Sequence, residues 1–482
     1  MTLQGSPIKF GTDGWRALVA RDFTFANVRA CAEGVSRLLH DEGAASRGLV
    51  VGYDTRFGSR EFAAEVAQVT TAQGIKTYLC DRVAPTPAIS YGVLHLRAGG
   101  GVVITASHNS GAWNGFKYKP QYAGSASPEV TAQLERYIAD AQRRQAEGTD
   151  AKALSLDEAK ARGLLEWHDP STAYLENVAS TIDLAAIRSA GLRIAVDNMH
   201  GAGAGYLAGL LDGGRTVVRQ LRAEPNPNFP GMVQPEPIAQ NLAPAAEAVR
   251  EHGFDLAFAT DGDADRLGIL DEHGGFISTL QSFALLCLHQ LEVRGQRGPL
   301  VKSLTQSAMI DKLGDQYEIP VHTTAVGFKY LGPVMMRENA LAAGEESGGY
   351  AFRGNIPERD GIFSALLFLE LMVRKGKRPS ELVEWLHQKV GPHHYDRWDV
   401  VLASGTHAPT TETLAQRAPD RLGGMRVEAT GVTDGVYFQL EGGFWGLVRA
   451  SGTEPLVRLY AEADDPERVQ RVLADLRSLA GL

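Results

Sequence analysis

One pattern occurs three times along the chain: an apolar strand-like run, a polar or glycine-rich turn, an amphipathic helix-like segment and a second apolar run. The three segments begin at Leu49, Leu192 and Gly298. Each ends its helical stretch in a turn that contains glycine before the next apolar run, which is typical of a β-α-β unit. The sequence therefore predicts three weakly similar α/β domains in tandem.

The pattern changes after "KVGPHHYDRW", which begins at Lys389. Strand-like runs follow from Met425 to Ala463, and one helix is expected from about Asp465 to Ala480. This succession favours a C-terminal α+β domain. A length of 482 residues suits three or four domains. We expect the boundaries 1–165, 166–276, 277–390 and 391–482.

Composition and charge exclude several classes of protein. The chain has 48 basic and 57 acidic residues, a net charge of -9, which argues against nucleic-acid binding and against a polybasic membrane surface. Cys31, Cys80 and Cys287 lie far apart, so neither a disulfide framework nor a zinc site is expected. The first residues lack the apolar core of a signal peptide, and no apolar run approaches the roughly 20 residues of a membrane span. A cytoplasmic protein is expected.

The stretch "GVVITASHNSGAWNGFK" places Ser107 in a loop after an apolar strand, the usual position of site residues in α/β sheets. A hydrolase nucleophile would have glycines two positions before and after it, but Thr105 and Asn109 stand there. His108 is the next residue, and adjacent side chains usually point apart. A Ser-His hydrolase is therefore disfavoured, whereas an ordinary polar turn remains possible on these residues alone.

A second loop, in "FDLAFATDGDADRLGILD", alternates Asp261, Asp263 and Asp265 after an apolar strand. Carboxylates at this spacing can point to one side, where they repel one another unless a cation joins them. Oxygen ligands favour Mg²⁺ or Ca²⁺. An EF-hand is excluded because Arg266 stands where that loop needs glycine. A solvated acidic turn is the lesser alternative, since apolar strands bracket the loop.

Two further loops suit a phosphorylated, hydroxyl-rich ligand. Glu345 and Ser347 lie between glycines in "GEESGG" and offer hydrogen-bond acceptors and a donor, although such loops are commonly plain turns. The turn in "GLVRASGTEPLVRLYAE" combines arginine, hydroxyl groups and a glycine that lets backbone N–H groups approach a phosphate. A hairpin with a surface arginine is the alternative. The residues concerned are Arg449, Ser451, Gly452 and Thr453, with Arg458 on the next strand.

The motifs "TASHNSGAWNGFK", "DGDADR", "GEESGG" and "RASGTEP" occur in this order, about one in each predicted domain, and "KFGTDGWR" and "YDTR" precede them. Over essentially its whole length the chain resembles the α-D-phosphohexomutase superfamily of phosphoglucomutases and phosphomannomutases. The resemblance implies four domains around a central cleft, each lending one loop. It also implies that Ser107 carries a phosphoryl group and holds one Mg²⁺ together with Asp261, Asp263 and Asp265.

The same resemblance implies roles for the other loops. Glu345 and Ser347 would meet the sugar hydroxyls, and the loop of Arg449, Ser451, Gly452 and Thr453 would clamp the phosphate already on the substrate. Further ligands would be Arg16, Lys302, Gly327, Lys329 and Arg458. Two positions depart from the family pattern: Gly349 stands where some members have histidine, and Arg359 where glucose-directed members often have lysine. Arginine is a poor proton acceptor, so the catalytic candidates are Lys117 as base, Arg359 acting electrostatically, and His108.

The implied reaction interconverts hexose 1-phosphate and hexose 6-phosphate through a phosphoserine and a 1,6-bisphosphate intermediate. Glucose 1,6-bisphosphate is the expected activator, since loss of the intermediate leaves a dephosphorylated enzyme. "GEESGG" favours glucose. Mannose or dual specificity, glucosamine phosphate, a phosphatase and a phosphosugar-binding protein without turnover are the alternatives. We expect a small-molecule phosphosugar as the partner, neither nucleic acid nor membrane, and a monomer or weak homodimer.

Overall fold

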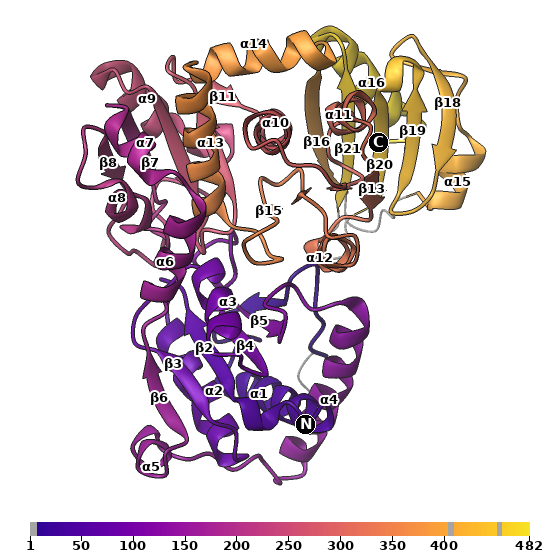
Figure 1. Ribbon diagram of the computed structural model, residues 1–482. Coiled ribbons are helices and arrows are strands. Elements are labelled where there is room, and N and C mark those ends of the chain that lie inside the picture. Colours follow the sequence, from indigo (N-terminus) through magenta and orange to yellow (C-terminus); the bar gives the residue numbers. More distant parts are fainter. Residues whose placement is uncertain (1–6, 403–408, 451–455) are drawn as a thin grey trace.

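The computed structural model describes residues 7–402, 409–450 and 456–482. These residues form four separate sheets, which we assign to domains I to IV in chain order. Domain I lies at the bottom of Figure 1, domain II at the upper left, domain III in the centre and domain IV at the upper right. The predicted fold class, three α/β domains and a C-terminal α+β domain, is confirmed.

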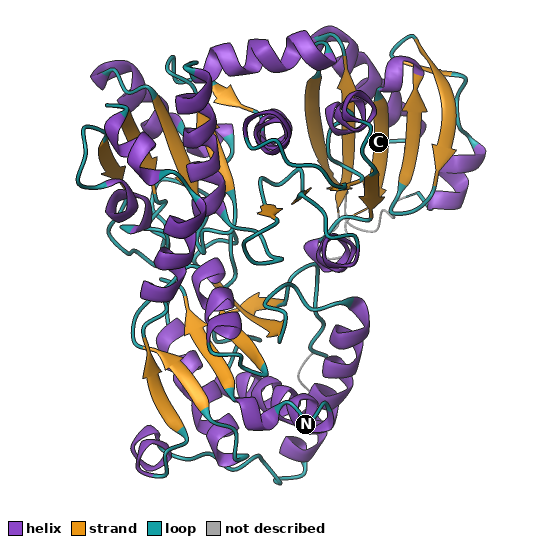
Figure 2. Ribbon diagram, viewed as in Figure 1, coloured by secondary structure: helices purple, strands orange, loops and turns teal. Residues whose placement is uncertain are grey.

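Domain I contains a six-stranded sheet in the order β1-β5-β4-β2-β3-β6. Its central strands β2 and β4 are buried at every residue, because helices cover both faces of the sheet (Figure 2). The sheet extends to His168, three residues beyond the predicted end of the domain at 165. The strands are β1 (Trp15–Leu18), β2 (Leu49–Tyr53), β3 (Thr77–Cys80), β4 (Gly100–Ile104), β5 (Trp113–Pro120) and β6 (Leu165–His168). The helices are α1 (Phe25–Asp41), α2 (Ser59–Ala72), α3 (Thr86–His95), α4 (Pro128–Ala146) and α5 (Leu156–Ala161).

Domain II contains a five-stranded sheet in the order β11-β10-β9-β7-β8. The antiparallel neighbours β9 and β10 are joined by the loop that carries the three aspartates. The strands are β7 (Arg193–Asp197), β8 (Val217–Leu221), β9 (Leu256–Thr260), β10 (Leu267–Leu270) and β11 (Phe276–Ile277). The helices are α6 (Thr172–Thr181), α7 (Leu184–Ser189), α8 (Tyr206–Leu211) and α9 (Ala243–His252).

Domain III contains a four-stranded sheet in the order β13-β12-β14-β15. Its helix α13 also packs on β9 and β10, so domains II and III share one continuous apolar core. The strands are β12 (Leu300–Ser303), β13 (Val321–Thr324), β14 (Ala342–Gly344) and β15 (Tyr350–Phe352). The helices are α10 (Thr279–Leu288), α11 (Met309–Tyr317), α12 (Phe328–Arg337), α13 (Gly361–Lys375) and α14 (Pro379–Val390).

Domain IV contains an antiparallel sheet in the order β16-β21-β20-β19-β18-β17, with its own apolar core under α16. Helix α16 covers residues 466–479, close to the predicted helix. No helix in the described ranges is long and apolar enough to cross a membrane. The strands are β16 (His394–Val401), β17 (Arg421–Leu422), β18 (Met425–Gly431), β19 (Val436–Leu440), β20 (Trp445–Ala450) and β21 (Leu456–Ala463). The helices are α15 (Thr411–Gln416) and α16 (Pro466–Leu479).

Candidate active site

The serine loop of domain I meets the aspartate loop of domain II. Ser107 is fully buried in the loop between β4 and β5, and its Oγ donates a hydrogen bond of 2.8 Å to Asp261 Oδ2. A Cβ added at Gly262 would lie 2.5 Å from the carbonyl oxygen of Ser107, so the two loops can approach this closely only because residue 262 is glycine. The sequence-predicted serine and aspartates are thus brought together.

The three aspartates form a buried cluster in which each offers a carboxylate oxygen within 4.8 Å of the others. Among the described residues, no hydrogen-bond partner reaches Asp263 Oδ1 or Asp265 Oδ1. Burial, reinforced by Asp265 and Asp263, raises the pKa of Asp261 well above its usual range. A buried, unpaired carboxylate oxygen is costly, and a divalent cation removes that cost. This oxygen-only donor set therefore fits a hard ion such as Mg²⁺.

Lys117, on β5, lies among carboxylates of both domains. Its Nζ is 2.7 Å from Asp13 Oδ2, 2.8 Å from Asp263 Oδ2 and 3.1 Å from Asp265 Oδ2. Burial alone would lower the pKa of Lys117, but the three carboxylates outweigh it and raise that pKa above its usual value. These contacts favour a protonated amine and an electrostatic role, while the base role expected for Lys117 stays a prediction.

Arg359, just before α13, extends from domain III into the same cluster. Its guanidinium forms an ion pair with Asp13, lies 2.9 Å from Asp265 Oδ2, and is 3.8 Å from Glu345 Oε2. A Cβ added at Gly349 would lie 2.3 Å from Cδ of Arg359. The two departures from the family pattern thus belong to one packing arrangement, which directs a permanent positive charge toward the aspartates.

His108 differs from its sequence-based expectation. Its Nδ1 lies 3.5 Å from Ser107 Oγ, so these adjacent side chains do not point apart. The reason is the backbone: Ser107 has a φ of 52°, in the left-handed region, which changes the direction of the chain between the two residues. Burial, together with the nearby cations Arg266 and Arg16, lowers the pKa of His108 well below its usual value and favours the neutral ring.

The "GEESGG" loop of domain III is attached to domain IV. Glu345 is buried, and burial raises the pKa of its carboxyl group. The next residue, Glu346, accepts hydrogen bonds from Tyr395 Oη at 2.8 Å and Arg397 Nη1 at 3.2 Å, both on β16. Ser347 follows in this loop, so hydrogen bonds tie the segment that carries the candidate sugar-binding residues to the edge of the C-terminal sheet.

The candidate phosphate ligand Arg449, on β20, is linked to another loop of domain III. Its Nε donates to Asp434 Oδ1 at 2.9 Å, and Asp434 Oδ2 accepts from the backbone N–H of Val326 at 3.0 Å. Gly327 follows, with a φ of 126° that favours glycine. Lys329 then donates from Nζ to the carbonyl oxygen of Gly11 in domain I at 3.1 Å. Domains I, III and IV therefore meet at residues 326–329.

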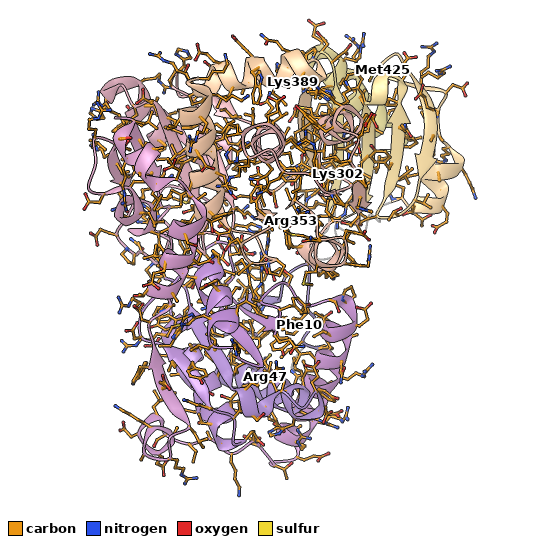
Figure 3. The ribbon with its side chains drawn as sticks, in the orientation of Figure 1. Phe10, Arg47, Lys302, Arg353, Lys389 and Met425 are labelled. Carbon is orange, nitrogen blue, oxygen red and sulfur yellow. The ribbon has the colours of Figure 1, made fainter. Side chains whose placement is uncertain are left out.

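The remaining candidate ligands are more dispersed. Arg16 donates from Nη1 to Asn109 Oδ1 at 2.7 Å and so contacts the serine loop directly. Lys302, labelled in Figure 3, forms an ion pair with Asp311. It lines a cavity of about 620 Å³ between domains III and IV. Arg458 Nε lies 3.6 Å from Asp399 Oδ2 on the neighbouring strand. Ser451, Gly452 and Thr453 lie outside the described residues.

The whole chain is similar to known phosphosugar mutases. Family models of phosphoglucomutase/phosphomannomutase α/β/α domains I, II and III match residues 7–145, 172–275 and 281–390, and the model of the C-terminal domain matches 413–479. The chain belongs to the α-D-phosphohexomutase superfamily. It is therefore a phosphohexomutase, and Asp261, Asp263 and Asp265 are the aspartate triad typical of the Mg²⁺ site in these enzymes.

Individual relatives of this phosphohexomutase are named for different substrates. It is 30% identical over 468 residues to the phosphoglucomutase/phosphomannomutase of Thermococcus kodakarensis, with 96% of both chains covered. It is 28% identical over 483 residues to the phosphoglucosamine/phosphogalactosamine mutase of Sulfurisphaera tokodaii, with 98% of both chains covered. A solved structure from Thermus thermophilus, provisionally assigned as a phosphomannomutase, has a TM-score of 0.86 and 34% identity, covering 99% of this chain and 100% of that one.

Sequence reasoning did not assign several buried charged residues of this phosphohexomutase. Lys119 Nζ lies 2.6 Å from Glu358 Oε2 and 3.1 Å from Asp13 Oδ1, which joins domain I to domain III beside Arg359. Strand alternation could have found Lys119, because it lies on the same face of β5 as Lys117. Asp13 and Arg56 belong to the motifs "KFGTDGWR" and "YDTR", but the sequence alone predicts no role for either residue.

Proposed function

We propose that this phosphohexomutase interconverts glucose 1-phosphate and glucose 6-phosphate, with Ser107 as the phosphoryl carrier and glucose 1,6-bisphosphate as the intermediate. One observation carries the proposal: Ser107 Oγ lies 2.8 Å from Asp261 Oδ2, in a buried aspartate cluster with unpaired oxygens. Phosphorylation of a serine adds about -1.5 to -2 charge units, which such a site tolerates only with cations beside it.

The aspartates and their basic neighbours supply those charges. Asp261, Asp263 and Asp265 would hold one Mg²⁺ together with phosphorylated Ser107, and the ion would neutralise negative charge on the transferring phosphoryl group. Lys117 and Arg359 keep positive charges at the same place. Both lie beside Asp265 and are almost completely buried, so water screens their charges little. Phosphoryl transfer depends mainly on positioning and charge stabilisation, which these residues provide.

The rest of the substrate would be held by domains III and IV. Glu345 and Ser347 would bind sugar hydroxyls, and Arg449 with Ser451, Gly452 and Thr453 would bind the phosphate that is not reacting. A clamp away from Ser107 is needed because either phosphate of the bisphosphate must be able to occupy it. The supporting ligands would be Arg16, Lys302, Gly327, Lys329 and Arg458.

A coupled assay tests the proposal: formation of glucose 6-phosphate from glucose 1-phosphate with Mg²⁺ and a trace of glucose 1,6-bisphosphate. Mannose 1-phosphate and glucosamine 1-phosphate are run in parallel, because relatives are named for phosphoglucomutase/phosphomannomutase and for amino-sugar mutase activity. We expect the highest kcat/KM with the glucose ester. A higher value for either competitor would overturn the glucose assignment, and steady release of inorganic phosphate would indicate a phosphatase.

A further inference from the structure

Arg56, which follows β2 in the "YDTR" motif, is buried behind the serine loop. Its side chain has no exposed surface, and Nε donates to Asp54 Oδ2 at 3.0 Å. The other four guanidinium N–H groups point at backbone carbonyl oxygens of the loop, so all five donors of the group are used. Nη2 lies 2.6 Å from the oxygens of Ser107 and Asn109, and Nη1 lies 2.8 Å and 3.0 Å from those of Ser110 and Trp113.

The neighbour Asp54 holds the other side of Ser107. Asp54 Oδ2 accepts a hydrogen bond of 2.6 Å from Thr105 Oγ1, and that hydroxyl oxygen accepts one of 2.9 Å from the N–H of Ser107. Both backbone groups of Ser107 are therefore engaged by the Asp54–Arg56 pair, directly or through Thr105. These contacts hold Ser107 in the left-handed conformation, with Oγ directed at Asp261.

Domain II covers one face of the guanidinium. The guanidinium carbon of Arg56 lies 4.9 Å from the centroid of the Phe229 ring, and Phe229 is itself only 1% exposed. A Cβ added at Gly111 of the serine loop would lie 2.3 Å from the carbonyl oxygen of Pro227. The serine loop is therefore packed between Arg56 and a loop of domain II.

We propose that Arg56 is a positioning residue for phosphoryl transfer: through the backbone of residues 107–113 it holds Ser107 Oγ at the metal-binding aspartates. This inference rests on the proposed function of Ser107. Lysine cannot replace arginine here, because an ammonium group has three donors on a flexible stem and cannot bind four carbonyl oxygens and a carboxylate in one plane. Displacement of a reacting group by about 1 Å can lower the rate by about 100-fold.

The test compares Arg56→Lys with Arg60→Lys, a control of the same chemistry at an exposed position on α2. Each variant is assayed for kcat and KM at saturating glucose 1,6-bisphosphate, at a temperature where circular dichroism shows it folded. Phosphorylation of Ser107 by the bisphosphate is followed by intact-protein mass. We expect Arg56→Lys to lose about 10- to 100-fold in kcat and to be phosphorylated more slowly. KM should stay within about twofold of the wild type, because the sugar and phosphate ligands are elsewhere.

The possible outcomes separate this inference from the proposed function. Wild-type kcat in folded Arg56→Lys, with an active wild type, overturns the positioning role alone. Absence of both turnover and Ser107 phosphorylation in the wild type overturns the proposed function and this inference together. If Arg56→Lys does not fold, Phe229→Leu replaces it, because it removes only the ring that covers the guanidinium. A lowered kcat with unchanged KM supports the role, and an unchanged kcat overturns it.

Discussion

Gly349 and the side chain of Arg359 share one space in the centre of the molecule. A Cβ at residue 349 would lie 2.3 Å from Cδ and 2.8 Å from Cγ of Arg359. The arginine stem passes through this space on its way to Asp13 and Asp265. Any side chain at residue 349 would therefore require the Arg359 stem to shift.

This relationship predicts a coupled effect on stability. Gly349→Ala should cost about 1–3 kcal/mol of unfolding free energy, the usual cost of overpacking a buried site. In an Arg359→Ala background only Cβ of residue 359 remains of the three nearest atoms, at an ordinary van der Waals distance of 3.4 Å, so the same substitution should cost less than about 0.5 kcal/mol. Urea unfolding of the four proteins measures the coupling, and equal costs in the two backgrounds would contradict the shared-space interpretation.

Ser107→Ala should nearly abolish mutase turnover while the protein stays folded, because it removes the proposed phosphoryl carrier and only one side-chain hydroxyl from the core. Turnover is measured with glucose 1,6-bisphosphate present, and phosphorylation is measured by intact-protein mass. Ser110→Ala, three residues further along the same loop, is the control and should remain phosphorylated. Substantial turnover by purified Ser107→Ala would rule out the phosphoserine role.

Mg²⁺ should stabilise the folded protein, because at the proposed site it would join aspartates that otherwise repel one another. At a concentration about 100 times its dissociation constant, Mg²⁺ should add about 2.7 kcal/mol to the free energy of unfolding. Chelation should reverse this gain and stop turnover. Asp263→Asn should weaken both effects, whereas Asp157→Asn, exposed on α5, should change neither. An unaltered Mg²⁺-dependent rise in Tm in Asp263→Asn would count against this site.

Acid sensitivity should depend on Glu370 of α13. Burial would raise the pKa of this carboxyl group, but the close contact with His289 Nε2, 2.9 Å away, and the charge of Arg294 outweigh burial and lower the pKa to about 2. Because this lies below the unfolded-state value of about 4.3, the stabilisation is complete above that pH and is lost as the pH falls toward 2. Glu370→Gln should therefore flatten the decline of unfolding free energy between about pH 4.5 and 2. Glu467→Gln changes an exposed side chain and should leave this pH dependence of the unfolding free energy unchanged.

The sequence predicted the elements whose pattern is local. Apolar runs followed by polar loops located Ser107 and the three aspartates at strand ends, and the C-terminal helix was placed within a residue of each observed end. Isolated charged residues carried no comparable pattern. Arg56 resembles a surface residue until contacts with a segment distant in the chain bury it. The closeness of His108 to Ser107 depends on the left-handed backbone of Ser107, which propensity does not predict for a serine.

The link from Arg449 through Asp434 to Val326 predicts a separate effect on substrate affinity. Asp434 fixes the Nε edge of the guanidinium and ties β20 to domain III, so Asp434→Ala should leave Arg449 less well oriented for the substrate phosphate. We expect KM for the phosphosugar to rise by about tenfold, equivalent to about 1.4 kcal/mol, with a smaller change in kcat. Asp464→Ala is the matched control, because it breaks another aspartate–arginine pair of domain IV, with Arg468 on α16. A KM no different from that of the control would mean that Asp434 does not orient Arg449. A rise in KM in Asp434→Ala alone would indicate that domain III helps to set the affinity of a phosphate clamp carried by domain IV.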